Sequence, residues 1–98
     1  MATFILLSKL TDEGAQTIKE EPERIREVNH ELEQMGVNVK NQWAVLGPYD
    51  FVNVVEAPDN LTIARVSAAL SARGTIRIMT LAAIPIDEFI EGSSAGKH

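Results

Sequence analysis

Gly47-Pro48-Tyr49-Asp50 decides the fold of this chain, because these four residues separate two runs that are typical of β-strands. In the first run, residues 37–46, apolar side chains alternate with polar or small ones, and the second run, residues 51–56, is rich in valine. A proline presets φ for a turn corner, and a glycine tolerates unusual backbone angles. Because the connection is so short, we predict that the two strands pair antiparallel as a hairpin.

The sequence on either side of this hairpin predicts two more strands and two helices. Residues 3–8 and residues 75–83 are short apolar runs bounded by polar residues or proline, as expected of strands. Apolar residues recur at helical spacing in the segments 22–36 and 60–74, and a glycine ends each segment. The order β-α-β-β-α-β is that of the ferredoxin-like fold, an α+β fold in which two helices cover one face of a four-stranded antiparallel sheet.

The first and the last of these strands are apolar on both faces. In the first strand, Phe4 and Leu6 point to one face and Ile5 and Leu7 to the other. In the last strand, Met79 and Leu81 point to one face and two isoleucines to the other. Two helices can cover only one face, and a solvated second face would be polar. We therefore predict that a second subunit covers it, with the sheets stacked face to face as a dimeric α/β barrel around a small cavity.

The rest of the chain predicts no second domain. We expect a single domain over residues 1–91, ending in a turn at residues 87–90 after Pro85, and a flexible tail over residues 92–98.

Composition excludes several classes of function. The net charge is −5, and the nine Lys and Arg residues form no run, which argues against a nucleic-acid binder. Cysteine is absent, so disulfide and thiolate chemistry are excluded, and we expect a cytoplasmic protein without a membrane segment. No phosphate-binding glycine motif or nucleophile elbow is present, and we expect neither a cofactor nor a metal. Six glutamates between residues 20 and 33 are interpreted as a solvated helix face.

The order and spacing of several short motifs resemble the GYD domain family, named for its Gly-x-Tyr-Asp signature. The signature stands here at residues 47–50, with Pro48 in the variable position. The resemblance covers nearly the whole chain and implies a ferredoxin-like, dimeric α/β barrel fold, but it implies no activity. Its other motifs are Thr11 with Gly14, Pro22-Glu23-Arg24, Glu56-Ala57-Pro58-Asp59, Arg77-Ile78-Met79-Thr80-Leu81 and Glu88-Phe89.

The signature turn provides the first candidate site. Tyr49 and Asp50 pair a phenol donor with a carboxylate, which would suit an amine, a hydroxyl or a cation. We favour a structural or interface role for Gly47, Tyr49 and Asp50, because Asp commonly accepts backbone N–H groups in turns and Tyr packs its ring.

Four further residues are candidates. Trp43 is odd-numbered like Val37 and Val39, so on a regular strand it points to the same face as these valines. This predicts a core position under the helices, and the alternative is the wall of a ligand cavity. Asn53 lies among valines and either reaches into a cavity or bonds across a dimer. Arg77 is predicted on the dimer face, as an anion contact or, preferably, at an edge open to solvent. His30 is interpreted as a surface residue.

The leading hypothesis is a small homo-oligomer, a homodimer or larger, that binds a small molecule or serves a structural or regulatory role. The alternative is a cofactor-independent monooxygenase or isomerase acting in the intersubunit cleft.

Overall fold

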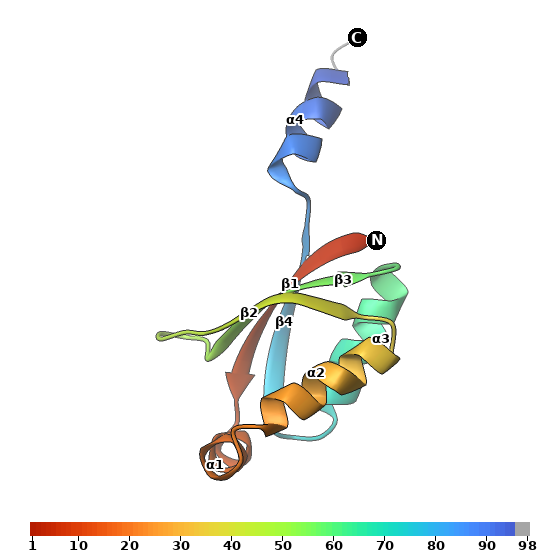
Figure 1. Ribbon diagram of the computed structural model, residues 1–98. Helices are drawn as coiled ribbons and strands as arrows, with labels where there is room; N and C mark the ends of the chain where they lie inside the picture. Colours follow the sequence, from red (N-terminus) through yellow and green to blue (C-terminus); the bar gives the residue numbers. More distant parts are fainter. Residues whose placement is uncertain (96–98) are drawn as a thin grey trace.

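The computed structural model describes the backbone of residues 1–95 and the side chains of residues 1–92. Within residues 1–95, four strands and four helices follow one another along the chain (Figure 1). In order they are β1 (Ala2–Leu10), α1 (Asp12–Glu20), α2 (Arg24–Gln34), β2 (Asn38–Ala44), β3 (Phe51–Ala57), α3 (Asn60–Ser71), β4 (Ile76–Ala83) and α4 (Ile86–Ala95).

The four strands form one sheet in the order β2-β3-β1-β4, and every neighbouring pair is antiparallel. This order confirms the α+β, ferredoxin-like prediction, because the first strand lies inside the sheet beside the last. The pairing of β2 with β3 is the predicted hairpin. Helices α2 and α3 lie on the same side of the sheet (Figure 1), which we call the helix face.

Local signals in the sequence set the helix ends. The Thr11 hydroxyl accepts the Gly14 N–H at the start of α1, and the Asp59 carboxylate accepts the Thr62 N–H at the start of α3. These bonds satisfy backbone donors that a helix N-terminus leaves without partners. After α2 and α3 the chain turns at Gly36 and Gly74, whose φ angles of 92° and 77° favour glycine.

The core lies between the helix face and the helices. Its strand residues alternate along β1 and β3, and its helix residues recur at helical spacing in α2 and α3, so each element contributes one apolar side. The buried apolar residues are Phe4, Leu6, Leu32, Val37, Val55, Ala57, Ile63, Val66 and Leu70.

The core position predicted for Trp43 is wrong, because β2 contains a register irregularity. Val39 pairs with Val55, but Asn41 already pairs with Val54, so one residue of β2 is skipped between them. Such a bulge reverses which side chains point to each face of the sheet. Trp43 therefore lies on the face away from the helices and is 50% exposed.

The end of the chain also differs from the prediction. The expected turn at residues 87–90 is a ten-residue helix, α4, which includes the first four residues of the expected tail; residues 96–98 lie outside the described residues. Asp87 and Glu88 in its first turn favour helix formation through the helix dipole. Helix α4 stands away from the sheet (Figure 1), and the radius of gyration is 15.2 Å, against about 13 Å for a compact domain of this length.

Within residues 1–95, no helix combines the length and the apolar character needed to cross a membrane.

Candidate functional site

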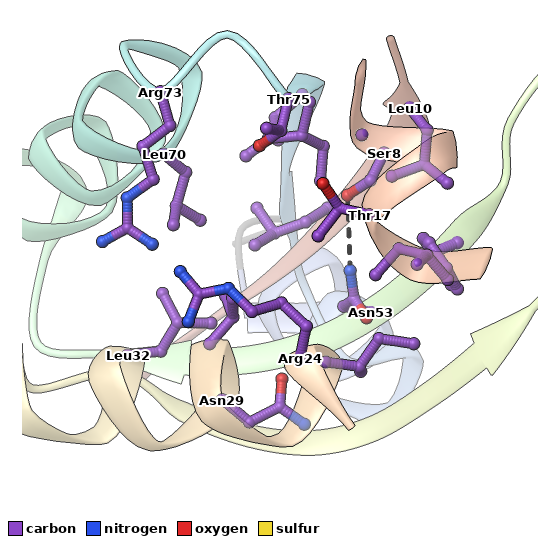
Figure 2. A pocket seen from close by; sticks show the side chains of 18 of the residues that line it. Ser8, Leu10, Thr17, Arg24, Asn29, Leu32, Asn53, Leu70, Arg73 and Thr75 are labelled. Atoms are coloured by element: carbon purple, nitrogen blue, oxygen red, sulfur yellow. Dashed lines mark hydrogen bonds between the residues drawn. The ribbon is translucent and has the colours of Figure 1, made fainter. Parts of the chain in front are cut away.

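A cavity of about 420 Å³ lies between the helix face of the sheet and helices α1 to α3 (Figure 2). Its walls are mainly apolar side chains from β1, α2, α3 and β4, among them Leu6, Val28, Leu32, Leu70 and Ile78. Polar side chains are fewer and come from separate elements, as in ligand pockets, where a small number of polar groups orient the ligand. They are Ser8, Thr17, Arg24, Asn29, Gln42, Asn53, Arg73 and Thr75.

Asn53 and Ser8 place a buried polar group on the sheet wall of the cavity. Asn53 is 7% exposed and Ser8 2% exposed, and the Asn53 Nδ2 donates a long bond of 3.5 Å to the Ser8 Oγ. Among the described residues, the carbonyl oxygen of the Asn53 side chain has no hydrogen-bond partner. A buried polar atom without a partner costs stability.

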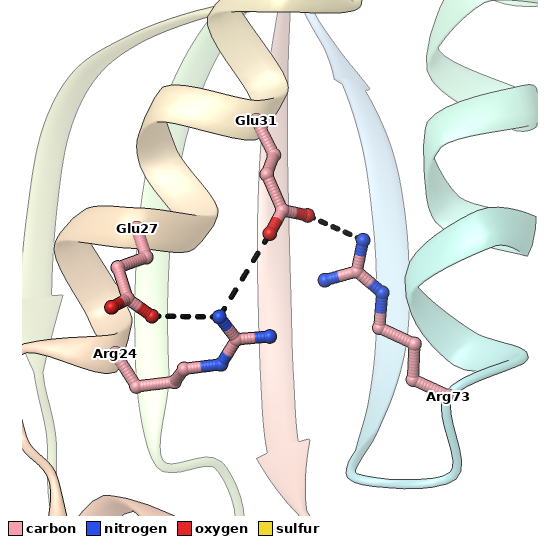
Figure 3. A network of polar contacts seen from close by, with 4 residues as sticks. All are labelled: Arg24, Glu27, Glu31 and Arg73. Carbon is pink, nitrogen blue, oxygen red and sulfur yellow. Dashed lines mark hydrogen bonds and ion pairs between the residues drawn. The ribbon is translucent and has the colours of Figure 1, made fainter.

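Two arginines of the cavity wall are joined by a shared glutamate (Figure 3). On α2, Arg24 Nη1 lies 2.7 Å from the Glu27 Oε2 and 4.0 Å from the Glu31 Oε1. The second oxygen of Glu31 accepts a hydrogen bond from Arg73, which follows α3. The network therefore links α2 to the end of α3 beside the cavity.

Charges in this network support one another. The hydrogen bond from Arg73, reinforced by the charges of Arg73 and Arg24, lowers the pKa of Glu31 below its ordinary value. The hydrogen bond and charge of Glu27 raise the pKa of Arg24. Both arginines are cations under all ordinary conditions, so they can bind anions but cannot act as a base.

Helix α1 closes one end of the cavity by a close approach of backbone to backbone. Gly14 lines the cavity, and a Cβ at this position would lie 1.9 Å from the Thr75 carbonyl oxygen. The Thr11 N–H donates to the same carbonyl at 3.1 Å, and its hydroxyl donates to the Gly74 carbonyl. A glycine is required here because no side chain fits.

The signature turn fastens the β2–β3 hairpin to β1. Asp50 Oδ2 accepts the Leu10 N–H at 2.8 Å, and the Asp50 N–H donates to the Ser8 carbonyl at 2.8 Å. Gly47 has a φ of 114°, a region that favours glycine. The Tyr49 hydroxyl lies 3.5 Å from the Met79 sulfur. In this subunit, the four residues thus position the hairpin tip over the end of β1.

The face of the sheet away from the helices, which we call the open face, carries exposed apolar side chains. Trp43 and Met79 are each 50% exposed and Leu81 is 42% exposed, and half-buried Ile5, Leu7, Val52 and Val54 lie between them. Arg77 belongs to the same face, where it is exposed and lies opposite Lys9 on the edge strand β4.

The structure separates the residues predicted from the sequence into two groups. Asn53 lines the cavity on the helix face, whereas Trp43, Tyr49, Asp50 and Arg77 do not. His30 is exposed on α2, as predicted, and its ring lies 3.3 Å from the Gln34 side chain. A cavity between two sheets remains a prediction, because the cavity found here lies within one subunit.

Sequence reasoning did not identify Ser8, Arg24 and Arg73 as neighbours. These residues come from β1, the first turn of α2 and the segment after α3, and the fold alone brings them to one cavity. The single available signal was the Pro22-Glu23-Arg24 motif, which was interpreted only as a helix start.

Comparison with known proteins gives consistent results. A crystal structure, that of TTHA0845 from Thermus thermophilus, superimposes with a TM-score of 0.55 over 87% of this chain and 95% of that chain; at 24% sequence identity it supports the fold. A Thermus thermophilus protein named "Glutamine synthetase and cystathionine beta-lyase binding protein" is 59% identical over 91 residues, covering 92% of this chain and 96% of the relative. The model of the GYD domain matches residues 4–92, and the chain therefore belongs to the GYD domain family.

Proposed function

We propose that this protein is a small cytoplasmic homo-oligomer that binds an enzyme, either glutamine synthetase or cystathionine beta-lyase. The observation that carries the proposal is the 59% identity to a Thermus relative named for binding these two enzymes. The alignment covers 96% of that relative, so nearly every part of it has a counterpart in this chain.

Self-association is proposed through the open face. Its apolar side chains continue along the chain from Met79 and Leu81 on β4 into α4, where Ile86, Phe89 and Ile90 are more than half exposed. Burying such a side chain contributes about 1.5–3 kcal/mol. A second copy can cover the open face and the apolar side of α4 together.

The charges of the open face favour a second copy as the occupant. Lys9 and Arg77 lie opposite each other at one end of the β1–β4 ladder, whereas Glu56 lies opposite Thr3 at the other end of β1 and also forms a 3.6 Å ion pair with Lys40. In a symmetric dimer with antiparallel stacked strands, the basic end of one face would meet the end of the other that holds Glu56, so the two basic ends would lie apart.

Small-molecule binding in the cavity is the second candidate function, favoured by the cavity volume and its buried Asn53 amide. The ionisable side chains among its lining residues are arginines, which cannot take up a proton. Such a lining supports binding better than proton-transfer catalysis, so the monooxygenase or isomerase alternative receives no support from it.

The enzyme-binding proposal is tested by co-elution. The purified protein is mixed with purified glutamine synthetase or cystathionine beta-lyase from its own source organism and passed over a size-exclusion column. The Thermus relative with the Thermus enzymes provides the positive control. We expect co-elution with at least one enzyme, and failure with both, while the Thermus pair co-elutes, would contradict the proposal.

A further inference from the structure

We infer that the cavity binds a small organic anion with two parts: an apolar body and a carboxylate or similar acid. The inference rests on the proposed small-molecule binding and defines the class of ligand. It does not depend on the enzyme partner, so the two proposals can fail separately.

The apolar body is inferred from the walls. Leu6, Leu32, Leu70, Ile76 and Ile78 supply aliphatic surface from four elements. A fully polar ligand would lose its hydration there without replacement hydrogen bonds, whereas an aliphatic or aromatic group is favoured.

The acid is inferred from Arg24 and Arg73, which enter the cavity wall from α2 and from the end of α3 (Figure 2). Each guanidinium has five N–H donors. The contacts with glutamates among residues 1–92 use one nitrogen of each, Nη1 of Arg24 and Nη2 of Arg73. Donors therefore remain for a second anion, and arginine binds carboxylates in a bidentate manner.

Glu31 holds the two guanidinium groups in place for this role. It contacts both arginines from the same helix face as Arg24, so the cations are positioned before a ligand arrives (Figure 3). A carboxylate can accept the guanidinium N–H groups that the glutamates do not use, which neither a cation nor a neutral apolar molecule can do.

The inference is tested by calorimetric titration with two matched probes. Indoleacetate has an aromatic body and a carboxylate, and indoleacetamide replaces the charged acid by a neutral group of similar shape. We expect indoleacetamide to bind about tenfold to hundredfold more weakly, since it loses charge-assisted hydrogen bonds.

Variants assign the effect to residues. Arg24→Gln and Arg73→Gln should each weaken indoleacetate about tenfold and leave indoleacetamide unchanged. The control is Arg26→Gln, which alters an exposed arginine on the same helix that pairs with Glu23 outside the cavity.

Each outcome has a defined meaning. Equal binding of indoleacetate and indoleacetamide would overturn the anion assignment while small-molecule binding stands. Binding by neither probe at millimolar concentration would overturn both.

Discussion

The two faces of the sheet have similar apolar content but different surroundings. On the helix face, alternate residues such as Phe4 and Val55 are fully buried under α2 and α3, and a cavity with few polar groups remains among them. On the open face, Trp43, Met79 and Leu81 are exposed. Their neighbours Ile5 and Val54 are also apolar, so this face is not a polar, solvated one. The described residues therefore enclose a cavity on one side of the sheet and leave the other side uncovered.

The α4 helix belongs with the open face in this comparison. It leaves the sheet after β4 and carries exposed apolar side chains, among them Ile86 and Phe89. Helix α4 stands away from the sheet (Figure 1). Like the open face, it presents apolar side chains that the described residues do not cover.

Two adjacent residues on β1 test the difference between the two faces of the sheet. Phe4→Ala, on the helix face, should lower the free energy of unfolding of the subunit by about 3–5 kcal/mol and leave the dimer dissociation constant unchanged. Ile5→Ala, on the open face, should cost the subunit less but raise the dissociation constant about tenfold or more. Urea unfolding and sedimentation equilibrium measure the two quantities. Equal effects of both variants on dissociation would break the comparison.

A pair of helical glycines tests the closure of the cavity. Gly14→Ala should destabilise the protein by at least about 1–3 kcal/mol, because the new methyl group meets the backbone at Thr75. The control is Gly92→Ala in α4, where nothing lies within 4 Å of an added Cβ, and it should be neutral or stabilising by up to about 1 kcal/mol. Thermal unfolding distinguishes them, and a stable Gly14→Ala variant would contradict the close approach.

The signature aspartate tests whether the hairpin tip is structural. Asp50→Ala removes the acceptor of the Leu10 N–H and should cost about 1–3 kcal/mol of unfolding free energy, whereas Asp50→Asn keeps an acceptor and should cost less. Chemical denaturation measures both. If the alanine variant were as stable as the unmodified chain, the structural role of the signature would be wrong.

The smallest expected effect concerns Glu31 beside the cavity. The pKa of Glu31 in the folded protein is lower than its ordinary value of 4.5. Glu31 therefore stabilises the fold fully at pH values above 4.5, and this contribution is lost as the pH falls through the folded pKa. Glu31→Gln should therefore cost up to about 1 kcal/mol at neutral pH, and the difference should vanish in acid. Thermal unfolding across pH measures it, with exposed Glu33→Gln as the control. A difference that persists in acid would contradict the ion-pair origin.

The fold could be predicted from the sequence because its signals are local. Turn chemistry at Gly47 and Pro48, the cap at Asp59 and the glycines at 36 and 74 each report on a few neighbouring residues, and they give the order of elements correctly. The place of Trp43 was missed because the bulge after Val39 leaves no mark in the alternation pattern.

The cavity could not be predicted for a different reason. Ser8, Arg24 and Arg73 lie on elements that meet only through the two crossovers of the fold, so no spacing in the sequence relates them. Asn53 was identified because a single amide among valines is conspicuous. Its position was ambiguous, since a strand residue can face either side of the sheet.

The mass of the protein in solution shows whether a second copy covers the open face. Sedimentation equilibrium at micromolar concentration should give at least twice the subunit mass of 10.7 kDa. Leu81→Glu on the open face should reduce it to one subunit, whereas Leu61→Glu, at an exposed apolar residue of α3, should leave it assembled. A mass of one subunit for the unmodified chain would contradict the account.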